Sequence, residues 1–348
     1  MKFILVLIGL LSFIPTNADA SELDTFNIDS ASLKHTILPL DSKRHVTVYL
    51  PDGYTQSDHK YPVIYYFHSF FWSDKQMFQD GVVKDLLDRS IKSGRIQPFI
   101  LVAADFSDQR IGSFYGNSEV SGRWLDFIIQ ELVPTIDERY RTLPDRRSRV
   151  AAGEMIGGYA AIKLAMFYPQ HFGHVYALHP VGTGTGLSPM SERPDWRIIH
   201  EANSFDEIAE AGNIFSTVFT AMAQAYSPNP KKPPLFADFM QEPMDGKLVK
   251  NQVVIQRLQQ EFLLDHLLPE HAANLQQVES LMFDWGRYDQ NFDHVHANRA
   301  LTLLLDEYGI EHEAEEYRGN TYDQNWVVGG RVEGNMLPFL NRHLRFSE

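Results

Sequence analysis

The stretch of the chain with the clearest chemical pattern is residues 150–159, V-A-A-G-E-M-I-G-G-Y. An apolar run before the first glycine predicts a strand, and an apolar run after the last glycine predicts a helix. Gly153 and Gly157 permit a tight turn between the two elements, because side chains at these positions would collide across it. The middle residue of the turn is Met155. A thioether has no ionisable proton, so this turn offers no nucleophile for acyl transfer.

Ionisable side chains follow several expected strands, and each has a chemical and a structural interpretation. Asp289 follows the strand expected at residues 280–284 and is either a functional acid or a cap for the next segment. Glu154, beside the glycines, is either a displaced acid or base, or a carboxylate favoured at a helix N-terminus. His179, before Pro180, is either a stand-in base or a structural residue of a turn.

A metal site deserves separate consideration, because His294 and His296 stand close to Asp289 and Asp293 in the chain. Two histidines two residues apart face away from each other on a helix and make a poor chelating pair. Cysteine is absent, which removes thiolate ligands and thiol nucleophiles. We therefore expect neither a metal nor another cofactor.

Aromatic residues are concentrated where a binding cleft could form. Phe70, Phe71 and Trp72 follow a predicted strand, and three large aromatic side chains in one loop cannot all be buried. We expect some of them to line a cleft, joined by Tyr322 and Trp326. The alternative is that these residues anchor a neighbouring insertion.

The elements that must position these residues alternate along the chain. Uninterrupted apolar runs predict strands buried on both faces, and apolar residues four apart predict a helix over residues 121–140. Strands that alternate with helices predict an α/β fold whose central sheet is mostly parallel and covered by helices on both faces. The predicted strands are residues 45–50, 62–67, 98–104, 149–152, 174–178, 280–284 and 313–317.

The rhythm of strands and helices is interrupted after Pro180. Residues 187–268 are expected to form a mostly helical insertion, or lid, over the active face of the sheet. Helices are predicted over residues 206–226 and 251–266, separated by the proline-rich residues 227–234. We expect residues 21–348 to form one domain with this insertion.

The N-terminus and the charge limit where the protein works and what it binds. Residues 1–20 carry Lys2, an apolar run and a small-x-small site, the pattern of a cleaved signal peptide, which predicts a periplasmic or secreted protein. The 348 residues have a net charge of −14, which disfavours nucleic acid and anionic membranes as partners. The oligomeric state is left open.

Several motifs together resemble the esterase D-like, or feruloyl esterase-like, branch of the α/β-hydrolase superfamily. They are R-H-V-T-V-Y-L-P-D-G-Y at residues 44–54, the strand ending in His68, G-E-M-I-G-G-Y-A-A at residues 153–161, and Y-P-Q-H-F-G at residues 168–173. The resemblance covers nearly the whole mature chain. It implies the α/β-hydrolase fold, a Ser–Asp–His triad in that order and an oxyanion hole.

Carried over position by position, the resemblance implies a degenerate triad. Met155 stands at the nucleophile position, Asp289 retains the acid position, and Thr321 stands at the histidine position. Ser69 replaces the usual glycine of the oxyanion loop, and the backbone N–H of Ile156 is the second donor that the family implies. Without nucleophile and base, most of a triad contribution of about 10⁶ in rate is lost.

Three hypotheses follow. The preferred one is a secreted pseudoesterase that binds a small aromatic or acyl-bearing ligand, or a protein partner, through the old cleft. The second is an active enzyme that uses relocated acid or base groups such as Asp289, Glu154 or His179, since one fold supports many reactions. The third is an interaction protein whose pocket has collapsed.

Overall fold

The computed structural model describes residues 21–108, 111–187, 190–321 and 324–347. The predicted signal segment and Tyr322 lie outside these residues. Within them, no helix is both long enough and apolar enough to cross a bilayer.

An eight-stranded sheet forms the centre of the molecule, in the order β1-β2-β4-β3-β9-β10-β13-β14. β1 and β2 are antiparallel to each other, β2 is antiparallel to β4, and all other neighbours are parallel. This confirms the predicted α/β class and the mostly parallel sheet. The strands are β1 (Glu22–Asp29), β2 (Lys43–Leu50), β3 (Val63–Phe67), β4 (Ile100–Ala104), β9 (Arg149–Glu154), β10 (His174–Leu178), β13 (Ser280–Gly286) and β14 (Glu313–Tyr317).

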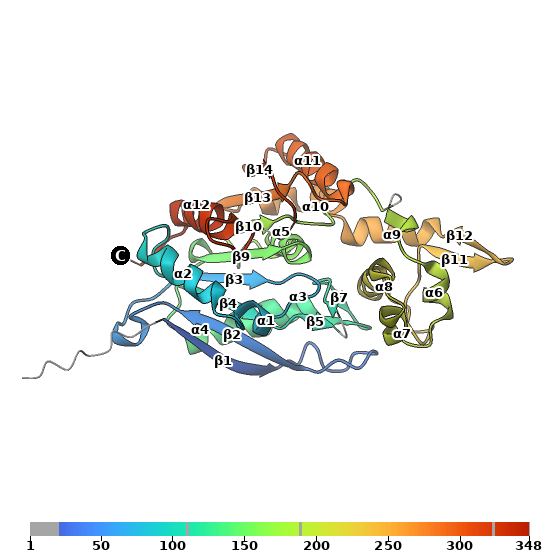
Figure 1. The fold of residues 1–348 in the computed structure, drawn as a ribbon, viewed down its shortest axis with the longest axis horizontal. Coiled ribbons are helices and arrows are strands. Elements are labelled where there is room, and N and C mark those ends of the chain that lie inside the picture. Colours follow the sequence, from blue (N-terminus) through green and yellow to red (C-terminus); the bar gives the residue numbers. More distant parts are fainter. Residues whose placement is uncertain (1–20, 109–110, 188–189, 322–323, 348) are drawn as a thin grey trace, which may run out of the picture.

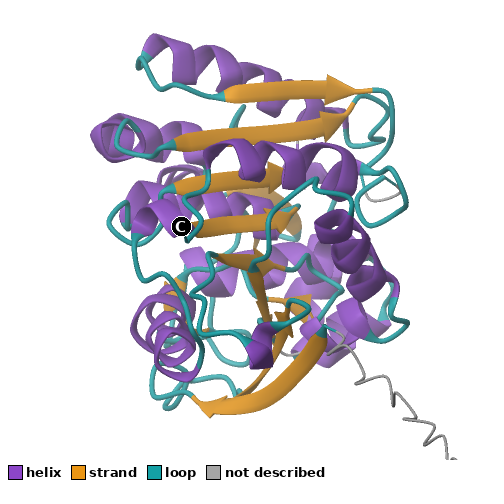
Figure 2. Ribbon diagram, turned by 90° about the vertical axis from the view of Figure 1, so that its left-hand side faces the viewer, coloured by secondary structure: helices purple, strands orange, loops and turns teal. Residues whose placement is uncertain are grey.

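Helices cover both faces of this sheet (Figures 1 and 2). Side chains alternate across each strand, so Tyr65 and Tyr66 of β3 belong to two different hydrophobic clusters, one on each face. One face is covered by α1 (Asp74–Phe78), α2 (Val82–Lys92), a π-helical turn η5 (Val332–Met336) and α12 (Leu337–His343). The other is covered by α3 (Trp124–Asp126), a π-helical stretch η2 (Phe127–Leu132), α4 (Val133–Arg139), α5 (Ile156–Phe167), α10 (Leu264–Leu275) and α11 (Phe292–Glu307).

The segment predicted as an insertion lies at the carboxyl ends of the parallel strands (Figure 1). The helix expected over residues 206–226 is divided at Gly212, whose φ of 82° ends α7, and the helix expected over 251–266 is divided at the extended residue Leu263. A small hairpin, which the sequence did not predict, joins them. The elements are α6 (Trp196–Glu201), α7 (Phe205–Glu210), α8 (Ile214–Tyr226), β11 (Gln241–Met244), β12 (Lys247–Lys250) and α9 (Gln252–Phe262).

Short elements complete the description. Two two-residue hairpins follow β4, and single 3-10 turns precede β3, β9 and α6. They are β5 (Ser107–Asp108) with β6 (Ile111–Gly112), β7 (Asn117–Ser118) with β8 (Gly122–Arg123), η1 (Tyr54–Gln56), η3 (Arg146–Ser148) and η4 (Met190–Glu192).

Candidate functional site

The glycine turn, residues 153–157, connects β9 to α5 as predicted. Met155 sits at its apex with φ 52° and ψ −115°, a backbone conformation that non-glycine residues rarely adopt. A Cβ on Gly153 would lie 2.5 Å from the carbonyl oxygen of Phe67, and one on Gly157 would lie 2.0 Å from it. The prediction that both positions require glycine is confirmed, because β3 runs directly against the turn.

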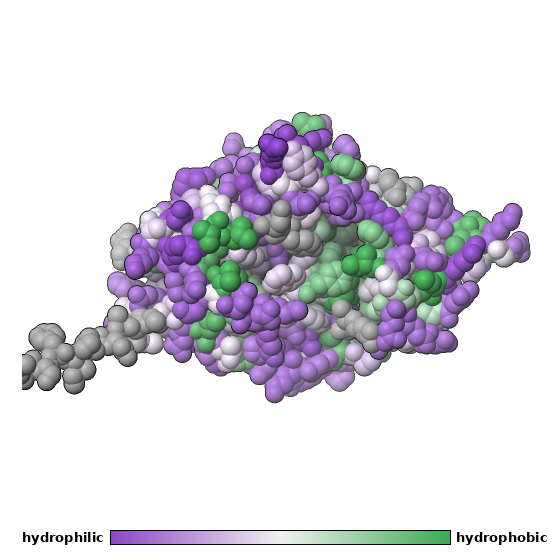
Figure 3. All heavy atoms as spheres, viewed as in Figure 1, coloured by the Kyte–Doolittle hydropathy of each residue, from purple (hydrophilic) through white to green (hydrophobic). Residues whose placement is uncertain are grey.

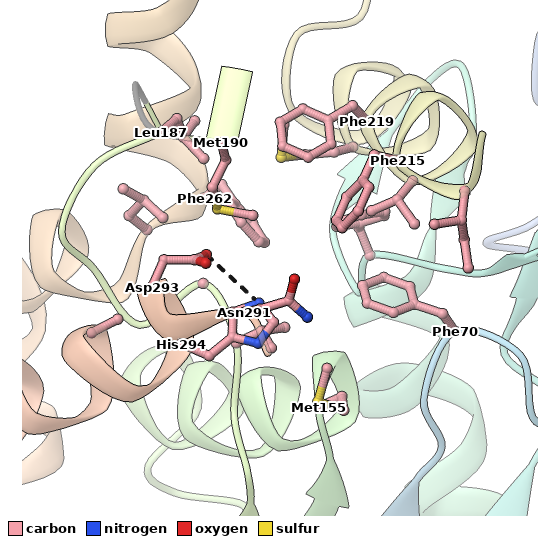
Figure 4. A pocket seen from close by; sticks show the side chains of 18 of the residues that line it. Phe70, Met155, Leu187, Met190, Phe215, Phe219, Phe262, Asn291, Asp293 and His294 are labelled. Carbon is pink, nitrogen blue, oxygen red and sulfur yellow. Dashed lines mark ion pairs between the residues drawn. The ribbon is translucent and has the colours of Figure 1, made fainter. Parts of the chain in front are cut away.

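A cavity of about 320 Å³ lies above this turn, between the strand ends and the inserted helices. A hollow bordered by hydrophobic side chains is visible there in the space-filling view (Figure 3). Met155 lies at one end of the cavity, and Phe215 and Phe219 of α8 form the opposite wall (Figure 4). The apolar lining is Phe70, Phe71, Phe114, Met155, Val181, Leu187, Met190, Ile214, Phe215, Val218, Phe219, Met222, Phe262, Leu263 and Ala297.

The polar lining of the cavity is small. One turn at the start of α11 supplies the polar edge, which consists of Asn291, Asp293 and His294 (Figure 4). Thr321 also lines the cavity, and among the described lining residues it is the one with a hydroxyl group. No described serine lines the cavity, so Thr321 and the polar edge carry its chemistry.

Asp289 is buried beneath the polar edge and accepts hydrogen bonds from three directions. Its Oδ2 contacts Nε2 of His179 at 2.8 Å and Nδ1 of His294 at 2.7 Å, and its Oδ1 accepts from the backbone N–H of Asn291 at 2.8 Å. Burial would raise the pKa of Asp289, but the hydrogen bonds from His179 and His294 outweigh it and hold this pKa below its usual range. Asp289 is therefore a carboxylate that orients two imidazoles.

The two imidazoles differ in what they can still do. Nδ1 of His179 accepts the N–H of Gly286 at 3.0 Å, so its Nε2 carries the proton given to Asp289, and both nitrogens of this fully buried ring are used. His294 uses Nδ1 for Asp289, and its Nε2 has no hydrogen-bond partner among the described residues. His179 does not line the cavity, whereas His294 does.

We call the group formed by His179, Asp289 and His294 the aspartate cluster. It also offers three possible metal-ligand atoms, which lie within 4.8 Å of one another. The hydrogen bonds above account for these short distances. The sequence pattern indicates His294 only as a possible metal ligand beside His296, and its spacing of five residues from Asp289 is the one signal for the contact that the structure shows.

Hydrogen bonds fix the loop after β3, which the resemblance predicts to be the oxyanion loop. Nδ1 of His68 donates to the carbonyl of Ser69 at 2.8 Å, and its Nε2 accepts the N–H of Phe106 at 2.9 Å. Ser69 and Ile156 are buried and lie outside the cavity lining, whereas Phe70 lines it. Trp72 is 44% exposed and also lies outside the lining.

Glu154 lies in a separate polar cluster with Asn325, close to Trp326 and Tyr66. Oε2 of Glu154 accepts from the side-chain amide of Asn325 at 2.8 Å, and Trp326 donates to the hydroxyl of Tyr66 at 3.0 Å. Burial raises the pKa of Glu154. Neither Glu154 nor Trp326 lines the cavity, so this group is placed to hold the loop rather than to meet a ligand.

Several known proteins similar to this chain are described as esterases. It is 32% identical over 136 residues to an endo-1,4-beta-xylanase/feruloyl esterase of Xylanibacter ruminicola, and 29% identical over 194 residues to Esterase Rv1288 of Mycobacterium tuberculosis. These matches cover 36% and 53% of this chain, but only 18% and 38% of those proteins.

Solved structures show the same fold. A ferulic acid esterase superimposes with a TM-score of 0.63 at 21% identity, covering 94% of this chain and all of that one. An S-formylglutathione hydrolase from Agrobacterium tumefaciens gives 0.57 at 14% identity, covering 94% and 97%. The predicted resemblance to feruloyl esterase-like α/β-hydrolases is confirmed. The Esterase family model, described as "Putative esterase", matches residues 39–328, and the chain belongs to this family.

Proposed function

We propose that this protein is a pseudoesterase: it keeps the esterase fold and a ligand cavity, but does not hydrolyse esters through a serine nucleophile. The observation that carries the proposal is Met155 at the apex of the glycine turn, facing an open cavity. The proposal includes the export predicted from residues 1–20. A protein partner at the same cavity is the alternative occupant.

The lining favours a small apolar ligand, aromatic or acyl-bearing. The cavity volume lies at the lower end of the range for small-molecule sites, and fifteen of its lining side chains are apolar. Transfer of about 100 Å² of ligand surface out of water would contribute about 2.5 kcal/mol. An open cavity also argues against the hypothesis that the pocket has collapsed.

The lack of serine chemistry follows from the groups at the two family positions. The thioether of Met155 has no proton to lose, and the hydroxyl of Thr321 cannot accept a proton as an imidazole does.

If the protein is instead an active enzyme, its base is not one of the residues first considered. Glu154 and His179 lie outside the cavity lining and their polar atoms are engaged, so a relocated base would have to be His294, oriented by Asp289. As a general base, His294 would take a proton from a water molecule while that water attacks the acyl carbon. The imidazolium would then give this proton to the alkoxide as the C–O ester bond breaks, which releases the alcohol and the free acid. This reading predicts a turnover that His294→Phe abolishes.

The proposal is tested by measuring binding and turnover with one preparation. Purified protein should bind the neutral fluorescent probe N-phenyl-1-naphthylamine saturably, and should hydrolyse p-nitrophenyl acetate and feruloyl esters no faster than heat-treated protein. Val218→Trp fills the cavity from α8 and should weaken probe binding at least tenfold. Val253→Trp, on the exposed face of α9, is the matched control and should change nothing. Substantial turnover, or binding that Val218→Trp does not affect, would refute the proposal.

A further inference from the structure

The polar edge of the cavity differs from the rest of its lining in being fixed by hydrogen bonds. Asp289 accepts from Nδ1 of His294 at 2.7 Å, which places the proton of the neutral imidazole on Nδ1 and leaves the lone pair on Nε2. The side chain of His294 is 11% exposed, and it reaches the cavity between Asn291 and Met155 (Figure 4). Nε2 is thus a directed acceptor at an otherwise apolar site.

The charged group nearest to Nε2 of His294 at the cavity is a carboxylate, not a cation. Asp293 Oδ2 lies 3.8 Å from Nε2 of His294, too far for a hydrogen bond, while its Oδ1 pairs with Arg193. Arg193 also donates to Oδ1 of Asn291 at 3.1 Å. Arg193 does not line the cavity, so its charge is used to hold the edge in place.

We propose that His294, oriented by Asp289, is the recognition group for a hydroxyl-bearing ligand: a phenol or alcohol whose apolar body fills the cavity and whose O–H donates to Nε2. This inference rests on the proposed function and names the head group of its ligand. A carboxylate at the same place would stand beside two aspartates, and Coulomb repulsion at a largely dehydrated site disfavours it.

A purely structural role would not require this arrangement. His179 alone gives Asp289 a buried imidazole partner, and the N–H of Asn291 gives it a further donor. His294 adds a second imidazole, and its Nε2 faces the cavity. A hydroxyl that donates to Nε2 would complete the hydrogen bonding of the ring, as Gly286 does for His179.

A matched ligand series tests the inference. 4-Butylphenol, butylbenzene and 4-butylbenzoate share one apolar body and differ in the head group. Isothermal titration of the wild type should give the tightest binding for the phenol, about tenfold tighter than butylbenzene, as expected for one buried hydrogen bond. The benzoate should bind weakest. His294→Phe should bring phenol and butylbenzene to equal affinity, whereas His296→Phe, on the exposed face of α11, should keep the tenfold preference.

The outcomes separate the inference from the proposed function. If phenol and butylbenzene bind the wild type equally, or the benzoate binds best, the head-group inference is wrong and the apolar cavity stands. If none of the three binds, the proposed function fails and takes the inference with it. Should His294→Phe not fold, the ¹⁵N signal of Nε2 in wild-type protein decides: it must shift with the phenol and stay unchanged with butylbenzene.

Discussion

Two turns at the carboxyl edge of the sheet border the same cavity and differ in what they present to it. The glycine turn after β9 has a strained backbone with Met155 at its apex, and the side chain there has no acid–base chemistry. The turn after β13 presents ionisable groups, since Asp289 is hydrogen-bonded to His294 at the start of α11.

The difference shows that backbone geometry and side-chain chemistry are constrained separately. The shape of the glycine turn is fixed by contact with Phe67, so it persists whatever residue occupies the apex. The aspartate cluster is fixed by hydrogen bonds that converge on one carboxylate, so the orientation of both imidazoles depends on Asp289. A substitution in the first turn should therefore destabilise the protein through steric clash, and loss of Asp289 in the second should do so by leaving buried imidazole N–H groups without a charged acceptor.

The largest effect is expected from Gly157→Ala. The new Cβ would lie 2.0 Å from the Phe67 carbonyl oxygen, and neither strand nor helix can retreat without disrupting the sheet. We expect a loss of at least about 4 kcal/mol in unfolding free energy, measured by urea denaturation. Gly158→Ala is the matched control, since its Cβ would be 3.2 Å from its nearest neighbour and should cost about 1 kcal/mol or less. Equal costs would show that the turn is not fixed by this contact.

Asp289→Asn should be the next most damaging change. The amide keeps the shape of the side chain but removes the charge that accepts two imidazole N–H groups, so we expect a cost of about 2–4 kcal/mol at pH 7. Asp293→Asn is the control; that carboxylate is partly exposed and pairs with Arg193, and its loss should cost under about 1 kcal/mol.

The stability difference between wild type and Asp289→Asn should also depend on pH. The pKa of Asp289 is lower in the folded state than in the unfolded chain, so its contribution to stability is complete above the unfolded value near 4 and is lost as the pH falls further. The gap in unfolding free energy between wild type and Asp289→Asn should be constant near pH 5 and narrow towards pH 3. A gap that widens on acidification would contradict the assigned charge.

The parallel strands and the glycine turn could be predicted from sequence because both follow from local pattern. Buried strands appear as uninterrupted apolar runs, and two glycines flanking an apex indicate a close backbone approach. β1 was not predicted: its residues alternate between polar and apolar at the edge of the sheet, and only pairing with β2 makes it a strand. The break at Leu263 likewise depends on how α9 and α10 fit against the body.

The sequence predicts only those parts of the site for which the family resemblance supplies a matching position. Met155, Thr321 and Phe70 were expected at the cleft and line the cavity, while Ser69, Trp72 and Glu154 were expected there and lie outside its lining. The role of His294 could not be read from periodicity. It depends on the turn between β13 and α11 bringing Nδ1 back onto Asp289, which is a property of the fold.

The comparison of the two turns also predicts a gain of function. Met155→Ser with Thr321→His would place a hydroxyl on the retained strained apex and an imidazole at the family position. We expect p-nitrophenyl acetate hydrolysis to rise about 10²-fold over wild type, well below a full triad, because Asp289 is already shared by two imidazoles. If Met155→Ser alone gives the same rise, His294 acts as the base for the new serine.

The smallest effect is expected for Lys163, whose buried amine lies behind the cavity wall. Replacing it tests whether the aspartate cluster is unusual among the buried ionisable groups. Lys163 of α5 lies 3.1 Å from the hydroxyls of both Tyr159 and Tyr226, and burial lowers its pKa to about 7. Tyr226 also donates to the carbonyl of Phe114 at 2.7 Å, so both tyrosines keep a partner when the amine is removed. Unlike Asp289, Lys163 is not needed by its neighbours.

Lys163→Met should therefore stabilise the protein slightly, by about 1 kcal/mol at pH 6, where the wild type must bury a charged amine. Between about pH 7 and pH 10 the unfolded lysine binds a proton that the folded one has released, so wild-type stability rises with pH relative to the variant. Each pH unit in this range adds up to about 1.4 kcal/mol to wild-type stability, so the advantage of the methionine variant should vanish within about one unit above pH 7 and reverse at higher pH, as followed by thermal denaturation. A variant that is less stable than wild type at pH 6 would show that Lys163 is required by its neighbours in the way that Asp289 is.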